Sequence, residues 1–204
     1  MTRIKGLYIL DKQSLSHIYG PDEQRAIAGM IEVYAPPQTS ESIEQNMALL
    51  ADAEVIISGW GAPVIDGAFL AAAPKLRAVF YGGGSIRHFT TEAFWRRNIA
   101  ITSAASANAV PVAEYTLAAI LLSLKQFWRF ASVTSTGGGW GDHTRAVPAC
   151  FQRTVGLISC GRTARRTLEL LNAFDLHRLV FDPWLTAAEA SELNVELVCL
   201  EDLF

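Results

Sequence analysis

The sequence predicts an α/β protein whose parallel sheets are covered by helices on both faces. Short apolar strand candidates alternate with helix candidates along most of the 204 residues, and strands that alternate with helices pair in parallel. Half of the residues are apolar and 18% are charged, which is typical of a globular chain and not of a disordered one. The length allows one domain, or two small ones, with a real hydrophobic core.

Five strand candidates lie in the first hundred residues. They are short apolar runs at positions 6–11, 31–35, 53–59, 76–82 and 99–104. Helix candidates between them cover 39–53, 65–74 and 90–98. The first of these helices has serine and threonine available as caps, and the second ends at Pro74. Five strands in this rhythm suit a flavodoxin-like open sheet, so we expect residues 1–105 to form such a domain.

The longest helix candidate covers about 108–130. Asn108 can cap this helix, and Pro111 is tolerated in a first turn, where no backbone hydrogen bond is lost. Its most apolar part, 112–124, contains Glu114 and is too short to span a bilayer. We therefore expect a buried helix and no membrane contact.

Residues 132–148 are loop-like and contain a second glycine triplet, Gly137–Gly139, beside Trp140. We expect this segment to form a loop or a dimer contact.

Strand and helix candidates alternate again after this loop. Strand candidates cover 154–159, 177–182 and 195–200, and helix candidates cover 164–174 and 186–193. A doubly wound dinucleotide-binding domain needs two βαβαβ halves. Residues 106–204 therefore match the first half of such a domain. We expect the sequence up to Phe204 to contain only this half.

A candidate phosphate turn joins the first strand and helix of this second unit. In the pattern G-x-G-x-x-G/A each small residue has a separate role in the turn, the approach to pyrophosphate and the helix packing. The six positions here are Ser159, Cys160, Gly161, Arg162, Thr163 and Ala164. Gly161 and Ala164 fit the second and third small positions. Ser159 replaces the first glycine, at a cost of about 1 kcal/mol if that position needs a positive φ.

Two further features favour a nucleotide site at this turn. The helix N-terminus offers free N–H groups, and Arg162 and Arg165 add positive charge. Asp182 ends the next strand about 20 residues beyond the turn, where a carboxylate binds ribose hydroxyls and favours NAD over NADP. The alternative is an ordinary βα turn, because such turns often contain a glycine and any strand can end in Asp.

A second candidate site lies where the strands of the first unit end. Ligands of open parallel sheets bind beyond the carboxyl ends of the strands, here at Asp11–Lys12, Trp60–Gly61, Tyr81–Ser85 and Ser103–Ala105. The run Gly82, Gly83, Gly84 and Ser85 offers successive N–H groups to a carboxylate, and Arg87 can add a bidentate contact. A flexible turn with a surface arginine remains the alternative.

Composition excludes other classes of function. The net charge of −3 and the scattered lysines and arginines argue against nucleic-acid binding. Cys150, Cys160 and Cys199 are not at metal-ligand spacing, so we expect reduced thiols and no metal site. The N-terminus contains no signal-peptide pattern, so we expect a soluble cytoplasmic protein.

Four segments together resemble the D-isomer-specific 2-hydroxyacid dehydrogenases. They are PKLRAVFYGGGSIRHFTTEAFWRRNIAITSAASAN, NAVPVAEYTLAAILL, TVGLISCGRTARRTLELLNAFDL and LVFDPW. The resemblance is spread over nearly all of the chain and keeps the order of the family. It implies a flavodoxin-like substrate domain, with a Rossmann domain inserted into it, and an NAD-dependent hydride transfer between a 2-hydroxy acid and a 2-keto acid.

The resemblance also assigns roles to residues. It implies substrate binding by Trp60 and the glycine loop, a cofactor contact at Thr116, and a homodimer formed through helix 108–130 and the following arm. The Arg, Glu and His that are catalytic in the family lie beyond Phe204, so no catalytic residue is assigned. His17, His143 and His177 are expected to be solvated or structural, and only His88 lies near a candidate ligand site.

A second hypothesis is a truncated, non-catalytic paralogue that acts as a dimerising or ligand-binding module. Two physical arguments favour it. The crevice between the first and fourth strands of a dinucleotide domain needs the fourth strand. Without that strand Val155–Ile158 is an exposed apolar sheet edge, which promotes aggregation unless a partner covers it.

Overall fold

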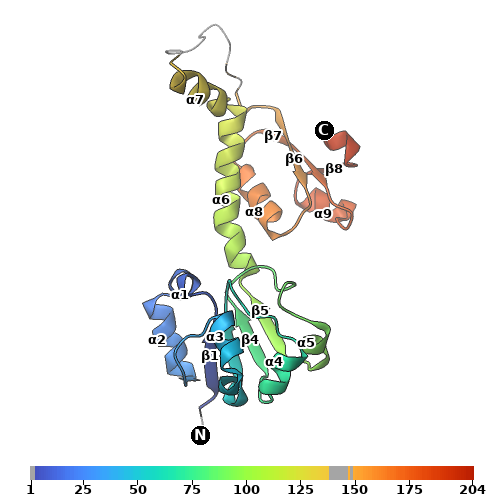
Figure 1. The fold of residues 1–204 in the computed structure, drawn as a ribbon. Coiled ribbons are helices and arrows are strands. Elements are labelled where there is room, and N and C mark those ends of the chain that lie inside the picture. Colours follow the sequence, from blue (N-terminus) through green and yellow to red (C-terminus); the bar gives the residue numbers. More distant parts are fainter. Residues whose placement is uncertain (1–2, 138–146, 148) are drawn as a thin grey trace. The chain divides into compact units, whose positions relative to one another are not determined.

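The computed structural model describes residues 3–137, 147 and 149–204. This part of the chain forms two compact units, Met1–Ala105 and Ser106–Phe204 (Figure 1). Each contains its own parallel sheet, so the predicted α/β class is confirmed. The second glycine triplet beyond Gly137, together with Trp140 and His143, lies outside the described residues.

The first unit contains a five-stranded parallel sheet in the order β2-β1-β3-β4-β5, which is the flavodoxin-like order. Its strands are β1 (Lys5–Ile9), β2 (Glu32–Val33), β3 (Val55–Ser58), β4 (Ala78–Tyr81) and β5 (Ala100–Ser103). Its helices are α1 (Lys12–Ile18), α2 (Pro21–Met30), α3 (Ser40–Gln45), α4 (Gly67–Ala72) and α5 (Glu92–Arg96). All five strand candidates are confirmed in position, although β2 has only two residues.

The helix expected over 39–53 is shorter than predicted. It ends as α3 at Gln45, and a separate 3-10 helix covers Met47–Asp52. Asn46 lies between them with φ −139° and ψ 58°, which interrupts the helical hydrogen bonds. Thr39 caps α3 through its side chain, as the sequence indicates.

Helices cover both faces of this sheet. On one face Leu7, Ile56 and Val79 of the strands pack with residues of α3, α4 and α5. On the other face Tyr8 and Ile57 pack with residues of α1 and α2. Because β1 and β3 are buried on both faces, they are apolar at successive positions and do not alternate with polar residues.

The second unit contains a three-stranded parallel sheet in the order β6-β7-β8. Its strands are β6 (Arg153–Ile158), β7 (Leu176–Phe181) and β8 (Glu196–Leu197). Its helices are α6 (Ala105–Leu124), α7 (Phe127–Ser135), α8 (Arg162–Leu171) and α9 (Ala187–Glu192), followed by a 3-10 helix at Glu201–Leu203. Leu168 of α8, Val180 of β7 and Ala190 of α9 form the centre of its core.

The prediction of one helix over 108–130 is wrong. The chain forms two helices, α6 and α7, which are separated at Gln126. Gln126 has φ 56°, a left-handed conformation that cannot continue an α-helix. Asn108 is not a cap, because α6 begins three residues earlier at Ala105, and Pro111 therefore lies inside the helix. The loop expected from Ser132 begins only after Ser135.

The length of α6 also changes the argument about membranes. With 20 residues and a mean hydropathy of 1.4, it is the one helix in the described part of the chain that is long and apolar enough to cross a membrane. Only 11% of its most apolar window is buried within the chain. Length alone therefore does not exclude a membrane span, contrary to the expectation from residues 112–124.

Candidate functional site

The turn that follows β6 holds a serine in a left-handed conformation. Ser159 has a φ of 74°, which costs a residue with a β-carbon about 1 kcal/mol. Its N–H donates to the carbonyl of Phe181 at 2.7 Å, which holds the turn against the end of β7. The first small position of the turn therefore needs a positive φ, and serine adopts it here.

Asp182 follows β7 and accepts hydrogen bonds on both carboxylate oxygens. Oδ2 accepts from the N–H of Cys160 at 2.7 Å and from the hydroxyl of Ser159 at 3.3 Å. Oδ1 accepts from the N–H groups of Trp184 at 2.8 Å and Leu185 at 3.1 Å. The N–H of Cys160 contributes most to holding the pKa of Asp182 below its usual value. The ionised carboxylate thus ties the turn after β6 to the loop after β7.

The N-terminus of α8 presents free backbone donors. Gly161 precedes the helix and supplies no side-chain cap. The N–H groups of Arg162, Thr163 and Ala164 have no acceptor in the described part of the chain, since the first helical bond runs from Arg165 N–H to the Gly161 carbonyl. A β-carbon at Gly161 would meet no atom within 4 Å, so the turn is open at this position. Free donors at a helix N-terminus favour an anion.

The two arginines near this turn have different environments. The guanidinium of Arg165 is already occupied. Its Nε donates to the Cys160 carbonyl at 3.1 Å, and its terminal nitrogen pairs with Glu189 at 3.2 Å. Arg162 is exposed and forms no ion pair within the described residues. Arg162 is therefore the arginine that is available to a bound anion.

The side chain of Cys160 points into the core of the unit. It is 6% exposed and packs in the cluster that contains Leu168 and Val180, and this burial raises the pKa of the thiol. Its N–H is used by Asp182. Cys160 therefore shapes the turn, and its thiol is not presented to a ligand.

Thr163 is half-buried, and its carbonyl accepts from the Thr167 hydroxyl at 2.9 Å.

Thr116 lies on α6, apart from the turn. Its hydroxyl donates to the Val112 carbonyl of the same helix at 2.7 Å. Thr116 lines a groove of about 380 Å³ together with Thr154 and Val155 of β6. These two residues belong to the first half of β6, whereas the turn follows its last residue, Ile158. The structure therefore does not bring Thr116 to the turn residues.

The glycine loop after β4 also presents free N–H groups. The N–H of Gly82 donates to the Ser58 carbonyl at 2.8 Å, and the Gly83 carbonyl accepts from Ala104 at 3.0 Å. These bonds fix the start of the loop. The N–H groups of Gly83, Gly84 and Ser85 have no acceptor among the described residues. The loop can therefore present three successive donors to an anion.

Close packing requires glycine at two positions of this loop. A β-carbon at Gly82 would lie 2.2 Å from Ile18 Cγ2, and one at Gly83 would lie 2.6 Å from the ring of Tyr81. Tyr19, the residue after α1, supports the loop, because its hydroxyl donates to the Ser58 carbonyl at 2.8 Å. Burial raises the pKa of Tyr19 to about 12, so this hydroxyl remains a donor. No sequence pattern indicated Tyr19.

Trp60 follows β3 at the same edge of the sheet as the glycine loop, since adjacent parallel strands end together. It is 48% exposed, and its carbonyl accepts from the N–H of Asp11 at 2.9 Å. Gly61 has φ 81°, and a β-carbon there would lie 2.1 Å from Asp11 Oδ1. The structure therefore brings Trp60, Asp11 and the glycine loop to one edge of the sheet.

Arg87 and His88 lie in the segment after the glycine loop. Both are exposed, and Arg87 forms no ion pair with any described residue. The ring of His88 packs edge-on against Tyr81, with ring centres 6.0 Å apart. Within residues 3–137, 147 and 149–204, no three His, Cys, Asp or Glu side chains gather in a metal-binding arrangement.

Comparison with known proteins identifies the fold and the family. The D-3-phosphoglycerate dehydrogenase of Mycobacterium tuberculosis is 26% identical over 193 residues, which cover 95% of this chain and 32% of that protein. A phosphoglycerate oxidoreductase from Rhizobium etli has the same fold, with a TM-score of 0.74, 22% identity, and coverage of 98% of this chain and 62% of that one. The chain thus spans about a third of the length of the curated relatives it matches.

A D-lactate dehydrogenase from Aquifex aeolicus, whose structure contains NAD and lactic acid, shares the fold with a TM-score of 0.64 at 18% identity, over 97% of this chain and 57% of that one. The family profile described as "D-isomer specific 2-hydroxyacid dehydrogenase, catalytic domain" matches residues 14–201. This family consists of NAD(P)-dependent dehydrogenases that act on CH–OH donors. The chain therefore belongs to the D-isomer specific 2-hydroxyacid dehydrogenases.

Proposed function

We propose that this chain acts in an NAD-dependent oxidoreductase that interconverts a 2-hydroxy acid and a 2-keto acid. The observation that supports this proposal best is the set of free N–H donors at the start of α8, next to an ionised Asp182. When bound, NAD supplies the nicotinamide carbon that accepts or donates the hydride. In this proposal the residues of this chain bind and orient NAD and the 2-hydroxy or 2-keto acid.

The two units have separate roles in this proposal. Residues 1–105 form the substrate domain, and residues 106–204 form the first half of a Rossmann NAD-binding domain. The order β6-β7-β8 supports this assignment, because the first three strands of a Rossmann sheet are adjacent in the order 3-2-1.

The turn between β6 and α8 would hold the pyrophosphate of NAD. Gly161, Arg162 and Thr163 lie at the free N–H groups, and the absence of a β-carbon at Gly161 lets the phosphates approach the backbone. Ser159 and Cys160 shape the turn. Asp182 would face the adenine ribose, and its negative charge would disfavour the extra phosphate of NADP.

The carboxyl edge of the first sheet would hold the substrate. The N–H groups of Gly83, Gly84 and Ser85 fit a carboxylate, and Gly82 is fixed beneath them by its bond to Ser58. Arg87, exposed beside this loop, would add charge-assisted hydrogen bonds. Trp60, which follows β3, would form one side of the substrate site.

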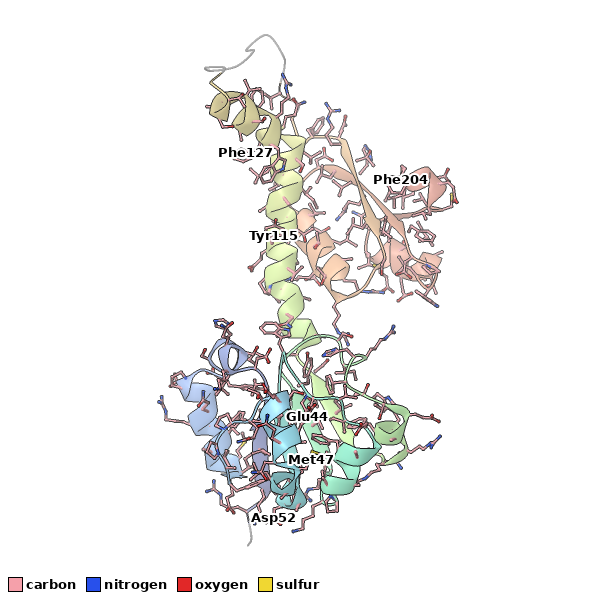
Figure 2. The ribbon with its side chains drawn as sticks, viewed as in Figure 1. Glu44, Met47, Asp52, Tyr115, Phe127 and Phe204 are labelled. Carbon is pink, nitrogen blue, oxygen red and sulfur yellow. The ribbon has the colours of Figure 1, made fainter. Side chains whose placement is uncertain are left out.

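We also propose that the chain forms a homodimer through α6 and α7, which replace the single helix expected over 108–130. Both helices expose large apolar side chains: Val112 is 49%, Tyr115 76%, Phe127 45% and Trp128 56% exposed. Figure 2 shows Tyr115 on α6 and Phe127 at the start of α7. An apolar surface of this kind is typical of an interface that a partner covers.

A non-catalytic dimerising or ligand-binding module is the second candidate. The specific observation in its favour is the edge of β6, which in the described part of the chain pairs only with β7 and leaves Ile158 58% exposed. The two candidates differ in whether bound cofactor is turned over.

Cofactor titration and turnover separate the two candidates. The quenching or enhancement of NADH fluorescence measures binding, and NADH formation from NAD with D-3-phosphoglycerate or D-lactate measures the reaction. Binding with turnover supports the oxidoreductase, and binding without turnover supports the module. The absence of both at millimolar ligand would contradict the dinucleotide site. A native mass measurement comes first, because it establishes the length of the chain that is tested.

A further inference from the structure

Asp182 has no free acceptor position for a ribose. A carboxylate offers about four lone-pair sites, two on each oxygen. All four are used within the chain, by the N–H groups of Cys160, Trp184 and Leu185 and by the hydroxyl of Ser159. A ribose hydroxyl that approaches Asp182 must therefore displace one of these donors.

Only one of the four donors can leave without moving the backbone. The N–H groups of Trp184 and Leu185 belong to the loop that begins at Asp182, and the N–H of Cys160 donates over the short distance of 2.7 Å. The Ser159 hydroxyl makes the longest of the four contacts, at 3.3 Å, and it belongs to an exposed side chain that rotates about one bond.

We propose that Ser159 competes with the ribose diol of a bound dinucleotide for Asp182 and thereby weakens recognition of that diol by this chain. This inference rests on the proposed function, because it concerns the same nucleotide site. A glycine at this position has no hydroxyl and leaves one acceptor site on Oδ2 open. Serine fills that site from within the turn, so the ribose gains a hydrogen bond only at the expense of an existing one.

The geometry also explains how serine is retained at a left-handed position. The φ of 74° places the side chain of Ser159 on the side of the turn that faces Asp182, where its hydroxyl finds a charged acceptor. The hydrogen bond offsets part of the backbone strain. The same hydroxyl therefore stabilises the turn and blocks the ribose site.

The experiment compares two nucleotides on three variants of the full chain by isothermal titration calorimetry. ADP carries the 2′-hydroxyl, and 2′-deoxy-ADP lacks it. Ser159→Ala removes the hydroxyl and keeps the β-carbon, whereas Ser159→Gly removes both. Ser191→Ala, an exposed serine on α9, is the matched control. Thermal unfolding of each variant verifies that it is folded, and Ser159→Gly also relieves the backbone strain.

In the unaltered chain and in Ser191→Ala, ADP and 2′-deoxy-ADP should bind within about twofold of each other, because the 2′-hydroxyl gains nothing net. In Ser159→Ala and Ser159→Gly, ADP should bind about three- to tenfold more tightly while 2′-deoxy-ADP changes little, the ratio expected for the net gain of one ordinary hydrogen bond. An unchanged ratio of the two affinities in both Ser159 variants overturns the inference. If neither nucleotide, nor NADH, binds any variant, the proposed function itself is overturned.

Discussion

The backbone N–H of Cys160 donates to Asp182 Oδ2 at 2.7 Å and joins the end of β6 to the end of β7. This bond fixes the turn that precedes α8, and it is the main reason why the pKa of Asp182 is lowered. The cofactor turn and the residue expected to read the ribose are therefore one hydrogen-bonded unit, and changes to either should affect both.

Asp182→Asn should lower the thermal midpoint of unfolding at neutral pH and leave it almost unchanged in strong acid. The pKa of Asp182 is lower in the folded state, so the stability from its ionised form is present above the ordinary aspartate pKa of about 4 and is lost as the pH falls through the folded value. Thermal unfolding from pH 7 to pH 2 measures the difference between the two proteins. Asp175→Asn is the control, because Asp175 is exposed and its side chain forms no ion pair with any described residue. A difference that does not shrink in acid would contradict the role of the carboxylate charge.

Gly82→Ala should destabilise the first unit by about 1–3 kcal/mol, the usual cost of overpacking, because its β-carbon would collide with Ile18 of α1. Gly84→Ala is the matched control, since a β-carbon there meets no atom within 4 Å. Urea denaturation gives the free energy of unfolding of each variant. Equal effects of the two substitutions would show that the loop does not pack as described.

Gly161→Ala should weaken ADP or NADH binding by at least about tenfold while changing the thermal midpoint little. The new β-carbon meets open space in the free protein but lies where the phosphates approach the turn. Gly67→Ala, also in open space and at the start of α4, should leave the nucleotide affinity unchanged. Fluorescence titration with thermal unfolding tests both expectations, and unchanged nucleotide affinity in Gly161→Ala would place the phosphates elsewhere.

Tyr115→Lys should shift the chain from dimer to monomer, because a charge at the 76% exposed Tyr115 opposes burial of α6 against a partner. Sedimentation velocity at several concentrations reports the species. Trp95→Lys changes a 52% exposed aromatic residue on α5 and should leave the dimer intact. Monomers in the unaltered chain, or dimers in Tyr115→Lys, would contradict the proposed interface.

Much of the architecture is predictable from local patterns. Apolar runs alternating with helices predict the parallel class, and all five strands of the first sheet lie where the sequence indicates. The four motif segments indicate the family, which the profile over residues 14–201 confirms. The break at Gln126 is not predictable in this way, because neither glycine nor proline marks it and its φ of 56° is unusual for glutamine.

The sequence by itself determined the class of fold, the family and the position of the candidate turn, since these depend on the periodicity of apolar residues and on short motifs. Only the tertiary structure decided what Asp182 binds. Its partner Cys160 is 22 residues away, and the parallel pairing of β6 with β7 brings the two strand ends together. The same pairing places the Ser159 hydroxyl on the carboxylate, so a serine that looks like a simple departure from glycine becomes a competitor for the ribose site. Local sequence cannot show this, because a hydrogen-bond partner is chosen by strand register and not by neighbours in the chain.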